Sequence, residues 1–174
     1  MHKKIINGVT AGLILLALSE SLVAKDINNE ELIASVKQDY RLIGKINNPS
    51  KKMQLIAVNQ SYFAMQYITD PSKEAQLAAV KQNYFAIQYI RSPSKEAQLA
   101  AVKQNYYAIG YIKNPSEEAQ LAAVKQSYFI IQHIKNPSKE AQIAAVKQSY
   151  VAIRYIENPD IEAIKVAQIG MLEK

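Results

Sequence analysis

The sequence predicts an all-α fold, an α-solenoid of six 22-residue helix-turn-helix repeats with a closing C-terminal helix. Three observations predict it. The stretch DPSKEAQLAAVKQNYFAIQYIR, residues 70–91, recurs six times between Asp26 and Glu157 at a period of 22 and without an insertion. Short polar side chains recur at two points of each unit, and apolar columns recur at helical spacing between them. Self-similarity at a short fixed period is typical of a solenoid.

Each unit contains two predicted helix starts. Asp70 precedes Pro71, and since proline fits the first helical position, Asp70 is predicted to be an N-cap and the first helix to span about residues 71–82. The equivalent residues are Asp26, Asn48, Ser92, Asn114, Asn136 and Asn158. A second N-cap is predicted at Asn83, which opens a second helix over residues 84–91. Its counterparts are Asp39, Ser61, Asn105, Ser127 and Ser149.

The alternative is one amphipathic helix per unit that is broken only at the proline. The residue types at the middle position favour two helices, because this position never carries a good helix former. Isoleucine-rich columns on the second helix form the predicted core seam, with Leu77, Val80 and their counterparts facing it from the first helix. The seam consists of Ile46, Ile68, Ile90, Ile112, Ile134 and Ile156, with Ile43, Met65, Ile87, Ile109, Ile131 and Ile153.

The ends of the chain differ from the repeats. Residues 1–24 combine Lys3 and Lys4 with an uncharged stretch and Ala24, a pattern that predicts a cleavable signal peptide and a secreted or periplasmic protein. A retained membrane anchor is the alternative, although the apolar stretch is short for a span. Residues 25–47 are a divergent N-terminal capping repeat, 48–157 are five tandem repeats, and 158–174 are a C-terminal capping helix.

The run AVKQNYFAIQYI, preceded by EAQLA, resembles the tandem helical repeats of domain of unknown function 4116. The resemblance covers about residues 28–157. It implies an α-helical repeat array with no established activity and no catalytic residues to transfer. Units of that family commonly place glycine after the Asn, where this chain has Tyr84 and its counterparts, so an N-cap turn fits better here than a left-handed glycine turn.

Tyrosines form two columns on the second helix, and these are the candidate binding residues. The first column is Tyr62, Tyr84, Tyr106, Tyr128 and Tyr150, with Tyr40 in the capping repeat, and the second is Tyr67, Tyr89, Tyr111 and Tyr155. Tyrosine offers a large, stiff contact area with a polar tip, which suits recognition of proteins or sugars. Alternatively, the rings pack at the edges between repeats. On a helix of 3.6 residues per turn, both columns lie about 110° from the centre of the core seam.

Polar residues in the first helix receive structural interpretations. Gln76 and its copies Gln54, Gln98, Gln120 and Gln142 lie within an apolar arc and are predicted to bond to backbone at the turn of an adjacent unit. Glu74 and Lys81, with their copies, are predicted to lie on the solvated face and to form weak pairs between units.

The composition and spacing of the residues argue against an enzyme, a metal site or a cofactor. The chain has no cysteine and two histidines, of which His2 lies in the predicted signal peptide and His133 replaces a tyrosine of the second column. No histidine cluster has metal-ligand spacing and no glycine-rich loop could cradle a phosphate. The net charge of +6 is spread thinly along the repeats, so the basic face that nucleic acid requires is not expected.

The sequence therefore predicts an exported, non-enzymatic repeat scaffold that binds a protein, peptide or glycan along one face. Two alternatives remain. One is lipid-surface binding by amphipathic 22-residue helices. The sequence speaks against it, because Gln82, Asn83 and Gln88 interrupt the continuous apolar face that such helices need. The other is a purely structural envelope protein.

Overall fold

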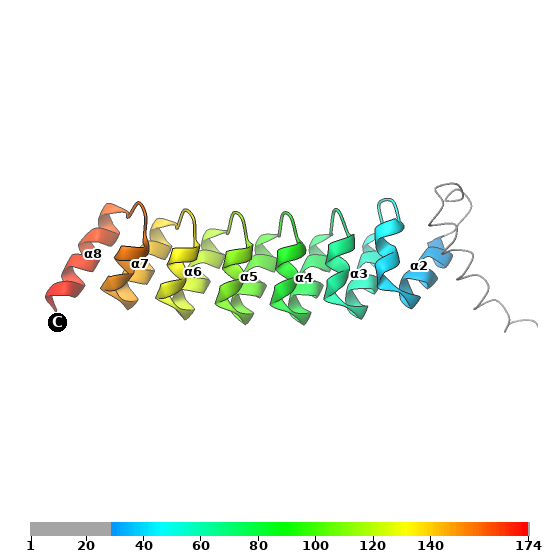
Figure 1. Cartoon of the computed structure of the whole chain (residues 1–174), viewed down its shortest axis with the longest axis horizontal. Coiled ribbons are helices and arrows are strands. Elements are labelled where there is room, and N and C mark those ends of the chain that lie inside the picture. Colours follow the sequence, from blue (N-terminus) through cyan, green and yellow to red (C-terminus); the bar gives the residue numbers. More distant parts are fainter. Residues whose placement is uncertain (1–28, 174) are drawn as a thin grey trace, which may run out of the picture. The chain divides into compact units, whose positions relative to one another are not determined.

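The computed structural model describes residues 29–173, and every regular element in this range is a helix. The predicted signal peptide and its cleavage point at Ala24 lie outside the described residues. Figure 1 shows the succession of elements. The α-helices are α2 (Asn29–Gln38), α3 (Lys51–Gln60), α4 (Lys73–Gln82), α5 (Lys95–Gln104), α6 (Glu117–Gln126), α7 (Lys139–Gln148) and α8 (Ile161–Leu172). The 3₁₀-helices are η1 (Tyr40–Lys45), η2 (Tyr62–Tyr67), η3 (Tyr84–Tyr89), η4 (Tyr106–Tyr111), η5 (Tyr128–His133) and η6 (Tyr150–Tyr155).

The chain divides into two compact units, Met1–Ala78 and Ala79–Lys174. In the described part of the first unit, α2 packs on α3 and η1 on η2. In the second unit the same rule gives two layers: α5, α6, α7 and α8 pack consecutively in one, and η3 to η6 in the other. This arrangement confirms the predicted all-α solenoid of repeats.

Each repeat is broken at its middle, as predicted. Asn105 has extended backbone angles (φ −156°, ψ 119°), which end α5, and its side chain accepts a hydrogen bond from the Tyr107 N–H at 2.9 Å. Asp39, Ser61 and Asn83 cap η1, η2 and η3 in the same way. Ser127 and Ser149 occupy the same position without a side-chain cap bond. The alternative of one unbroken helix per unit is therefore wrong.

The second helix of each repeat is a 3₁₀-helix. Only six residues separate the mid-repeat cap from the next loop, a length that suits the tighter helix. At 3.0 residues per turn, Tyr84, Ile87 and Ile90 fall in one line, so the first tyrosine column continues the line of the core residues. The prediction that both tyrosine columns lie about 110° from the seam assumed 3.6 residues per turn. For the first column this prediction is wrong.

The predicted N-cap at Asp70 and at its equivalents from Asn48 to Asn158 is also wrong, since the cap lies two residues later; the equivalent Asp26 lies outside the described residues. The Ser94 Oγ accepts a hydrogen bond from the Ala97 N–H at 3.2 Å, and Ser50, Ser72, Ser116 and Ser138 do the same. Pro93 thus precedes the helix instead of opening it. A serine cap places Glu96 in the first turn, where a carboxylate interacts favourably with the helix dipole.

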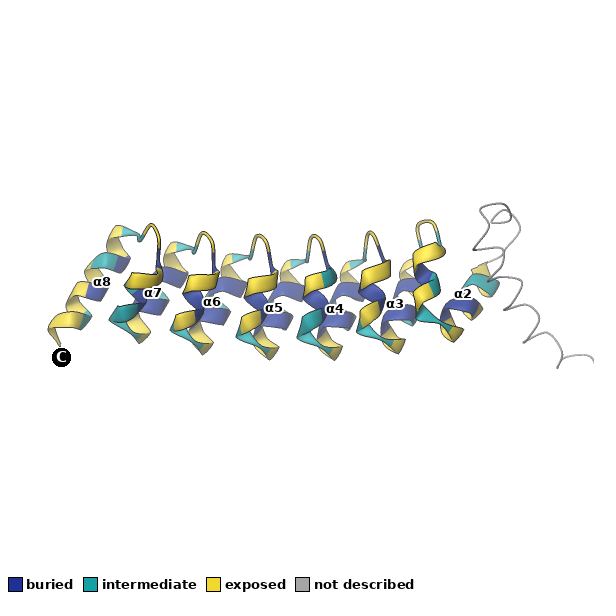
Figure 2. Cartoon of the chain, viewed as in Figure 1, coloured by how far each residue is buried: buried dark blue, intermediate teal, exposed yellow. Residues whose placement is uncertain are grey.

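Small side chains form the α-layer side of the core. In α5, Ala97, Ala101 and Val102 are fully buried. Leu99, predicted to face the seam, is only half-buried. From the 3₁₀ layer, Ala108, Ile109 and Ile112 complete the core. The residues of the isoleucine seam are buried except for Ile46, at the end of η1 in the first described repeat, and Ile153 in η6, which packs on α8. Both are half-buried. Figure 2 shows this burial on the sides of the helices that meet their neighbours.

Candidate binding surface

The two predicted tyrosine columns have different exposures on the 3₁₀ layer. All members of the first column, Tyr40, Tyr62, Tyr84, Tyr106, Tyr128 and Tyr150, are half-buried. In the second column Tyr67, Tyr111 and Tyr155 are 40%, 45% and 38% exposed, whereas Tyr89 is half-buried. The second column therefore offers the larger free surface.

Sequence reasoning missed a third aromatic column. It consists of Phe63, Phe85, Tyr107 and Phe129, each directly after a tyrosine of the first column. Tyr107 is 53% exposed and Phe129 44%. At three residues per turn, each lies in line with the residue three positions later, which is also exposed, so this side of the 3₁₀-helix faces outward. The signal was available, since four consecutive repeats carry an aromatic residue here, but a 3.6-residue helix places it elsewhere.

In the second unit, Phe85 and Phe129 of the third column contact rings of both other columns, and Tyr107 contacts a ring of the first column. Within repeats, Tyr84 stacks on Phe85 with centroids 4.5 Å apart, and Tyr106 lies over Tyr107 at 4.4 Å. Between repeats, Phe85 contacts Tyr111 at 5.6 Å. Tyr128 and Phe129 lie 6.5 Å apart edge to face, and Phe129 meets Tyr155 at 5.0 Å. We call the residues Tyr84, Phe85, Tyr106, Tyr107, Tyr111, Tyr128, Phe129 and Tyr155 the aromatic band.

The first unit has two ring contacts. Tyr62 stacks on Phe63 at 4.3 Å, and Tyr40 meets Tyr67 edge to face at 6.2 Å. Gly44 allows this approach, since a Cβ there would lie 3.1 Å from the Tyr67 Cβ. In the second unit, a hydrogen bond with the Tyr107 side chain raises the pKa of the Tyr106 phenol. The rings are therefore held by neighbours while part of their faces stays open.

Buried glutamines tie each repeat to the next and support this surface. Gln120 is 6% exposed; its Nε2 donates to the Pro115 carbonyl at 3.0 Å, and its Oε1 accepts from the Ser138 N–H of the following repeat at 2.7 Å. Gln54, Gln98 and Gln142 make the equivalent pair of bonds. The prediction that this glutamine column bonds to the turn of an adjacent unit is confirmed. We call it the first glutamine ladder.

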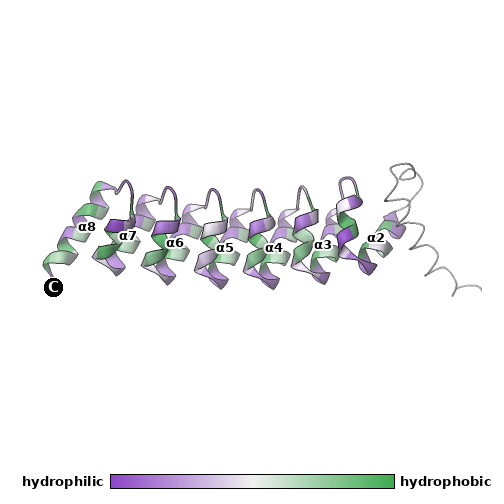
Figure 3. Cartoon of the chain, viewed as in Figure 1, coloured by the Kyte–Doolittle hydropathy of each residue, from purple (hydrophilic) through white to green (hydrophobic). Residues whose placement is uncertain are grey.

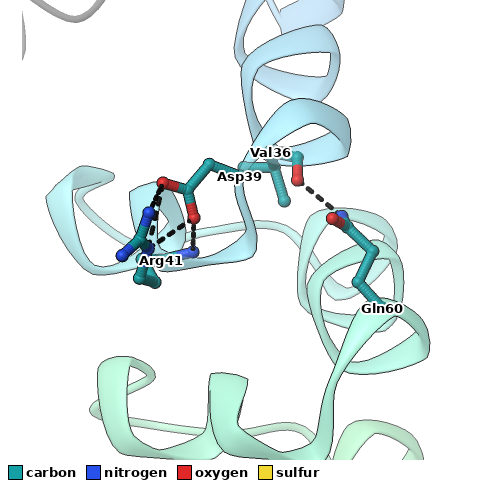
Figure 4. A network of polar contacts seen from close by, with 4 residues as sticks. All are labelled: Val36, Asp39, Arg41 and Gln60. Atoms are coloured by element: carbon teal, nitrogen blue, oxygen red, sulfur yellow. Dashed lines mark hydrogen bonds and ion pairs between the residues drawn. The ribbon is translucent and has the colours of Figure 1, made fainter.

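A second glutamine ladder runs in the opposite direction. The Gln60 Nε2 donates to the Val36 carbonyl, 24 residues earlier, at 2.6 Å (Figure 4). Gln104, Gln126 and Gln148 donate to Val80, Val102 and Val124 at 2.7 Å. Sequence reasoning gave these residues no such role. Each of these four bonds joins the last turn of one α-helix to the last turn of the helix before it, which fixes the register between the repeats.

Charged groups lie at the surface, as predicted, and some pair between repeats. Lys51 lies 3.1 Å from Glu74, and Lys139 lies 2.6 Å from Glu162. Exposed pairs of this kind contribute little stability. Figure 4 shows a local pair in the first described repeat, where Arg41 hydrogen-bonds to Asp39 and holds the pKa of that carboxyl below its ordinary value.

Shallow polar clefts lie between successive loops. In the first unit a cleft of about 400 Å³ is lined by Asn48, Gln54 and Tyr67, among others. Asn48 has a left-handed backbone (φ 51°), a conformation that asparagine tolerates. In the second unit, clefts of about 360 and 230 Å³ are lined by the loops of neighbouring repeats. The side chains of Gln54, Gln98 and Gln142, which line these clefts, already hydrogen-bond to the loop backbone.

The described residues contain no group of three or more histidine, cysteine, aspartate or glutamate side chains that could hold a metal ion. His133 is exposed at the end of η5. Across residues 29–173, no helix combines the length and apolar character needed to cross a membrane.

Comparisons with known proteins found no matching family model, no similar curated protein and no similar solved structure. The resemblance to domain of unknown function 4116 therefore stays a prediction.

Proposed function

We propose that this protein is an exported, non-enzymatic scaffold that binds a protein, peptide or glycan along the aromatic band. The observation that carries the proposal is the ring-to-ring contact of the band combined with its exposure. Tyr107, Tyr111, Phe129 and Tyr155 each leave 38–53% of their surface accessible while contacting other rings. Aromatic rings held in place lose little entropy on binding, which is why rigid aromatic residues dominate recognition surfaces.

The break at the middle of each repeat favours this function over lipid-surface binding. A lipid-bound 22-residue helix needs one continuous apolar face. Here the apolar residues of both helices meet in the core between the layers, and Ala101, Val102 and Ile109 are at most 1% exposed. The proposed export depends on the signal-peptide pattern of residues 1–24.

Removal of the outer rings tests the proposal. The variant Y107A/Y111A/F129A removes exposed rings from two successive repeats. Binding is screened on glycan arrays, on arrays of extended peptides and against envelope extract, and the Kd is then measured for each hit. We expect the variant to lose at least about tenfold in affinity, because exposed aromatic anchors commonly contribute more than 1.4 kcal/mol together.

The control K103A/K125A changes exposed residues of the α layer. It should bind as the unmodified chain does, and circular dichroism should show both variants folded. Equal affinity of Y107A/Y111A/F129A and the unmodified chain for every hit would refute the proposal. Helicity that develops only after lipid vesicles are added would instead support the lipid-surface alternative.

A further inference from the structure

The charges of the second unit are divided unequally between its two layers. Between residues 83 and 156 the 3₁₀-helices and the loops that follow them carry four cations and no carboxylate side chain. The four cations are all exposed, and they are Arg91, Lys113, Lys135 and Arg154. Helices α5, α6 and α7 carry lysine and glutamate in near balance, five against four. Between these residues the excess of positive charge therefore lies on the 3₁₀ layer.

Three of these cations recur at one position of successive repeats. We call Arg91, Lys113 and Lys135 the cation row; Glu157, at the same position of the next repeat, ends it. Arg91 and Lys113 line one cleft between loops, and Lys135 lines the equivalent cleft together with Tyr155 of the aromatic band. Figure 3 shows these loops as hydrophilic. The cleft that Lys135 and Tyr155 share places the cation row beside the band.

The charges of the cation row are not neutralised by neighbouring side chains. Within residues 29–173 the side chains of the row form no ion pair or hydrogen bond. On the α layer, in contrast, Lys95 lies 3.9 Å from Glu118 and Lys139 lies 2.6 Å from Glu162. Complementary charge gives an interface its specificity, so a partner that fits this edge of the band is acidic.

The spacing of the repeats selects the conformation of the partner. Neighbouring α-helices of the second unit are in contact, and helices in contact lie about 8–10 Å apart. A polyproline II helix has three residues per turn and rises about 3.1 Å per residue, so every third side chain returns to one side after about 9.3 Å. On one face of a β-strand the side chains recur after about 7 Å, and the turn of an α-helix rises about 5.4 Å. Of these three conformations, only polyproline II presents one side chain to each repeat.

The aromatic band also suits proline better than sugar. Aromatic-lined surfaces bind polyproline II chains, whose preformed shape loses little entropy on binding. Such a chain leaves its backbone carbonyls free, and the exposed amides of Gln88 and Gln132 on the 3₁₀ layer can donate to them. A glycan would need partners for its many hydroxyl groups. The exposed residues of η4 are Tyr107, Gly110 and Tyr111, which offer only phenol groups.

We propose that the aromatic band and the cation row together bind an acidic, proline-rich peptide in the polyproline II conformation, with a carboxylate at every third residue. The inference rests on the proposed function, since it names the ligand of the same band. Each carboxylate pairs with one cation of the row, and the prolines between them pack on the rings. Successive turns of the peptide thus meet successive repeats.

Fluorescence anisotropy with labelled synthetic peptides, measured on the full chain at 0.15 M salt, tests the proposal. The probe is (EPP)6. The controls are (KPP)6, in which the charge is reversed, and (EP)9, which has the same length and more carboxylates but returns them to one side only at every second turn. We expect (EPP)6 to bind at least tenfold more tightly than (KPP)6 and at least threefold more tightly than (EP)9. Charge alone would give the opposite order for the two acidic peptides.

Reversal of the cation row tests the pairing. The variant R91E/K113E/K135E introduces the residue that the next repeat carries at this position, Glu157, so the fold should tolerate it. It should bind (EPP)6 at least tenfold more weakly, and (KPP)6 more tightly, than the unmodified chain does. The matched control K103E/K125E/K147E makes the same change of charge at exposed residues of the α layer. It should bind (EPP)6 within about twofold of the unmodified chain, because salt screens distant charges.

The outcomes separate this inference from the proposed function. No binding of (EPP)6 at 1 mM, binding of (EP)9 that is equal or tighter, or binding of (EPP)6 that R91E/K113E/K135E leaves unchanged would overturn the inference. Tighter binding of polygalacturonate that Y107A/Y111A/F129A abolishes would also overturn it, while supporting the proposed function. Tighter binding of oligo(dT) would overturn both. Binding of (EPP)6 that depends on the cation row but not on the rings would likewise overturn both.

Discussion

Replacement of Gln120 by methionine should destabilise the protein although the side-chain volume hardly changes. The substitution removes a donor to the Pro115 carbonyl and an acceptor from the Ser138 N–H. A buried polar group left without its partner costs about 1–3 kcal/mol, so two groups cost about 2–6 kcal/mol. Pro115 and Ser138 are half-buried, and water can replace part of the loss. We therefore expect a loss of about 2–4 kcal/mol in the free energy of unfolding.

Guanidinium unfolding followed by circular dichroism measures this loss. Gln132 in η5 is exposed, so the control Q132M should stay within about 0.5 kcal/mol of the unmodified chain. Hydrogen exchange adds a local measurement, since the Ser138 amide should exchange faster in Q120M. A Q120M protein as stable as Q132M would refute the view that the first glutamine ladder stabilises the contact between repeats.

Two further substitutions test local features of the repeat. N105A removes a cap that accepts a bond from the Tyr107 N–H, so it should lower the free energy of unfolding by about 1 kcal/mol. S127A should lower it less, because Ser127 makes no side-chain cap bond; equal losses in chemical unfolding would contradict this. G44A places a Cβ 3.1 Å from the Tyr67 Cβ and should lower Tm, whereas G110A meets nothing within 4 Å and should leave Tm unchanged or raise it. A Tm that falls equally in both variants would argue against the close approach at Tyr67.

The sequence was sufficient to predict the repeat and its break. The period and the cap chemistry at Asn83 and Asn105 are local properties, and a cap residue acts on an N–H two positions away. The start of the first helix was misplaced because Asp70 and Ser72 flank Pro71, and both are good N-cap residues. Only the packed loop distinguishes them: the Asp70 carbonyl and the Ser72 N–H both bond to Gln54 of the preceding repeat.

The aromatic band was only partly predicted, for a geometric reason. Projection at 3.6 residues per turn treats the two tyrosine columns alike and disregards the position after the first column. Six residues between a cap and a loop form a 3₁₀-helix, in which Tyr107 and Phe129 are exposed and the first column lies in line with the core. The type of helix depends here on the short distance between the mid-repeat cap and the next loop. The helix propensities of the residues carry no information about this distance.

The second glutamine ladder could not be inferred from the sequence, since its partners lie 24 residues earlier and Gln104 reads as a solvated residue beside Lys103. Together the two ladders explain the absence of insertions. The first spans 18 residues forward and the second spans 24 residues back, and both cross one boundary between repeats. An inserted residue between Gln120 and Ser138 would shift the Ser138 N–H away from its acceptor. Because the ladders fix the register between repeats, they also fix the spacing of the rings in the aromatic band. A partner that contacts successive rings must therefore itself be extended or repetitive.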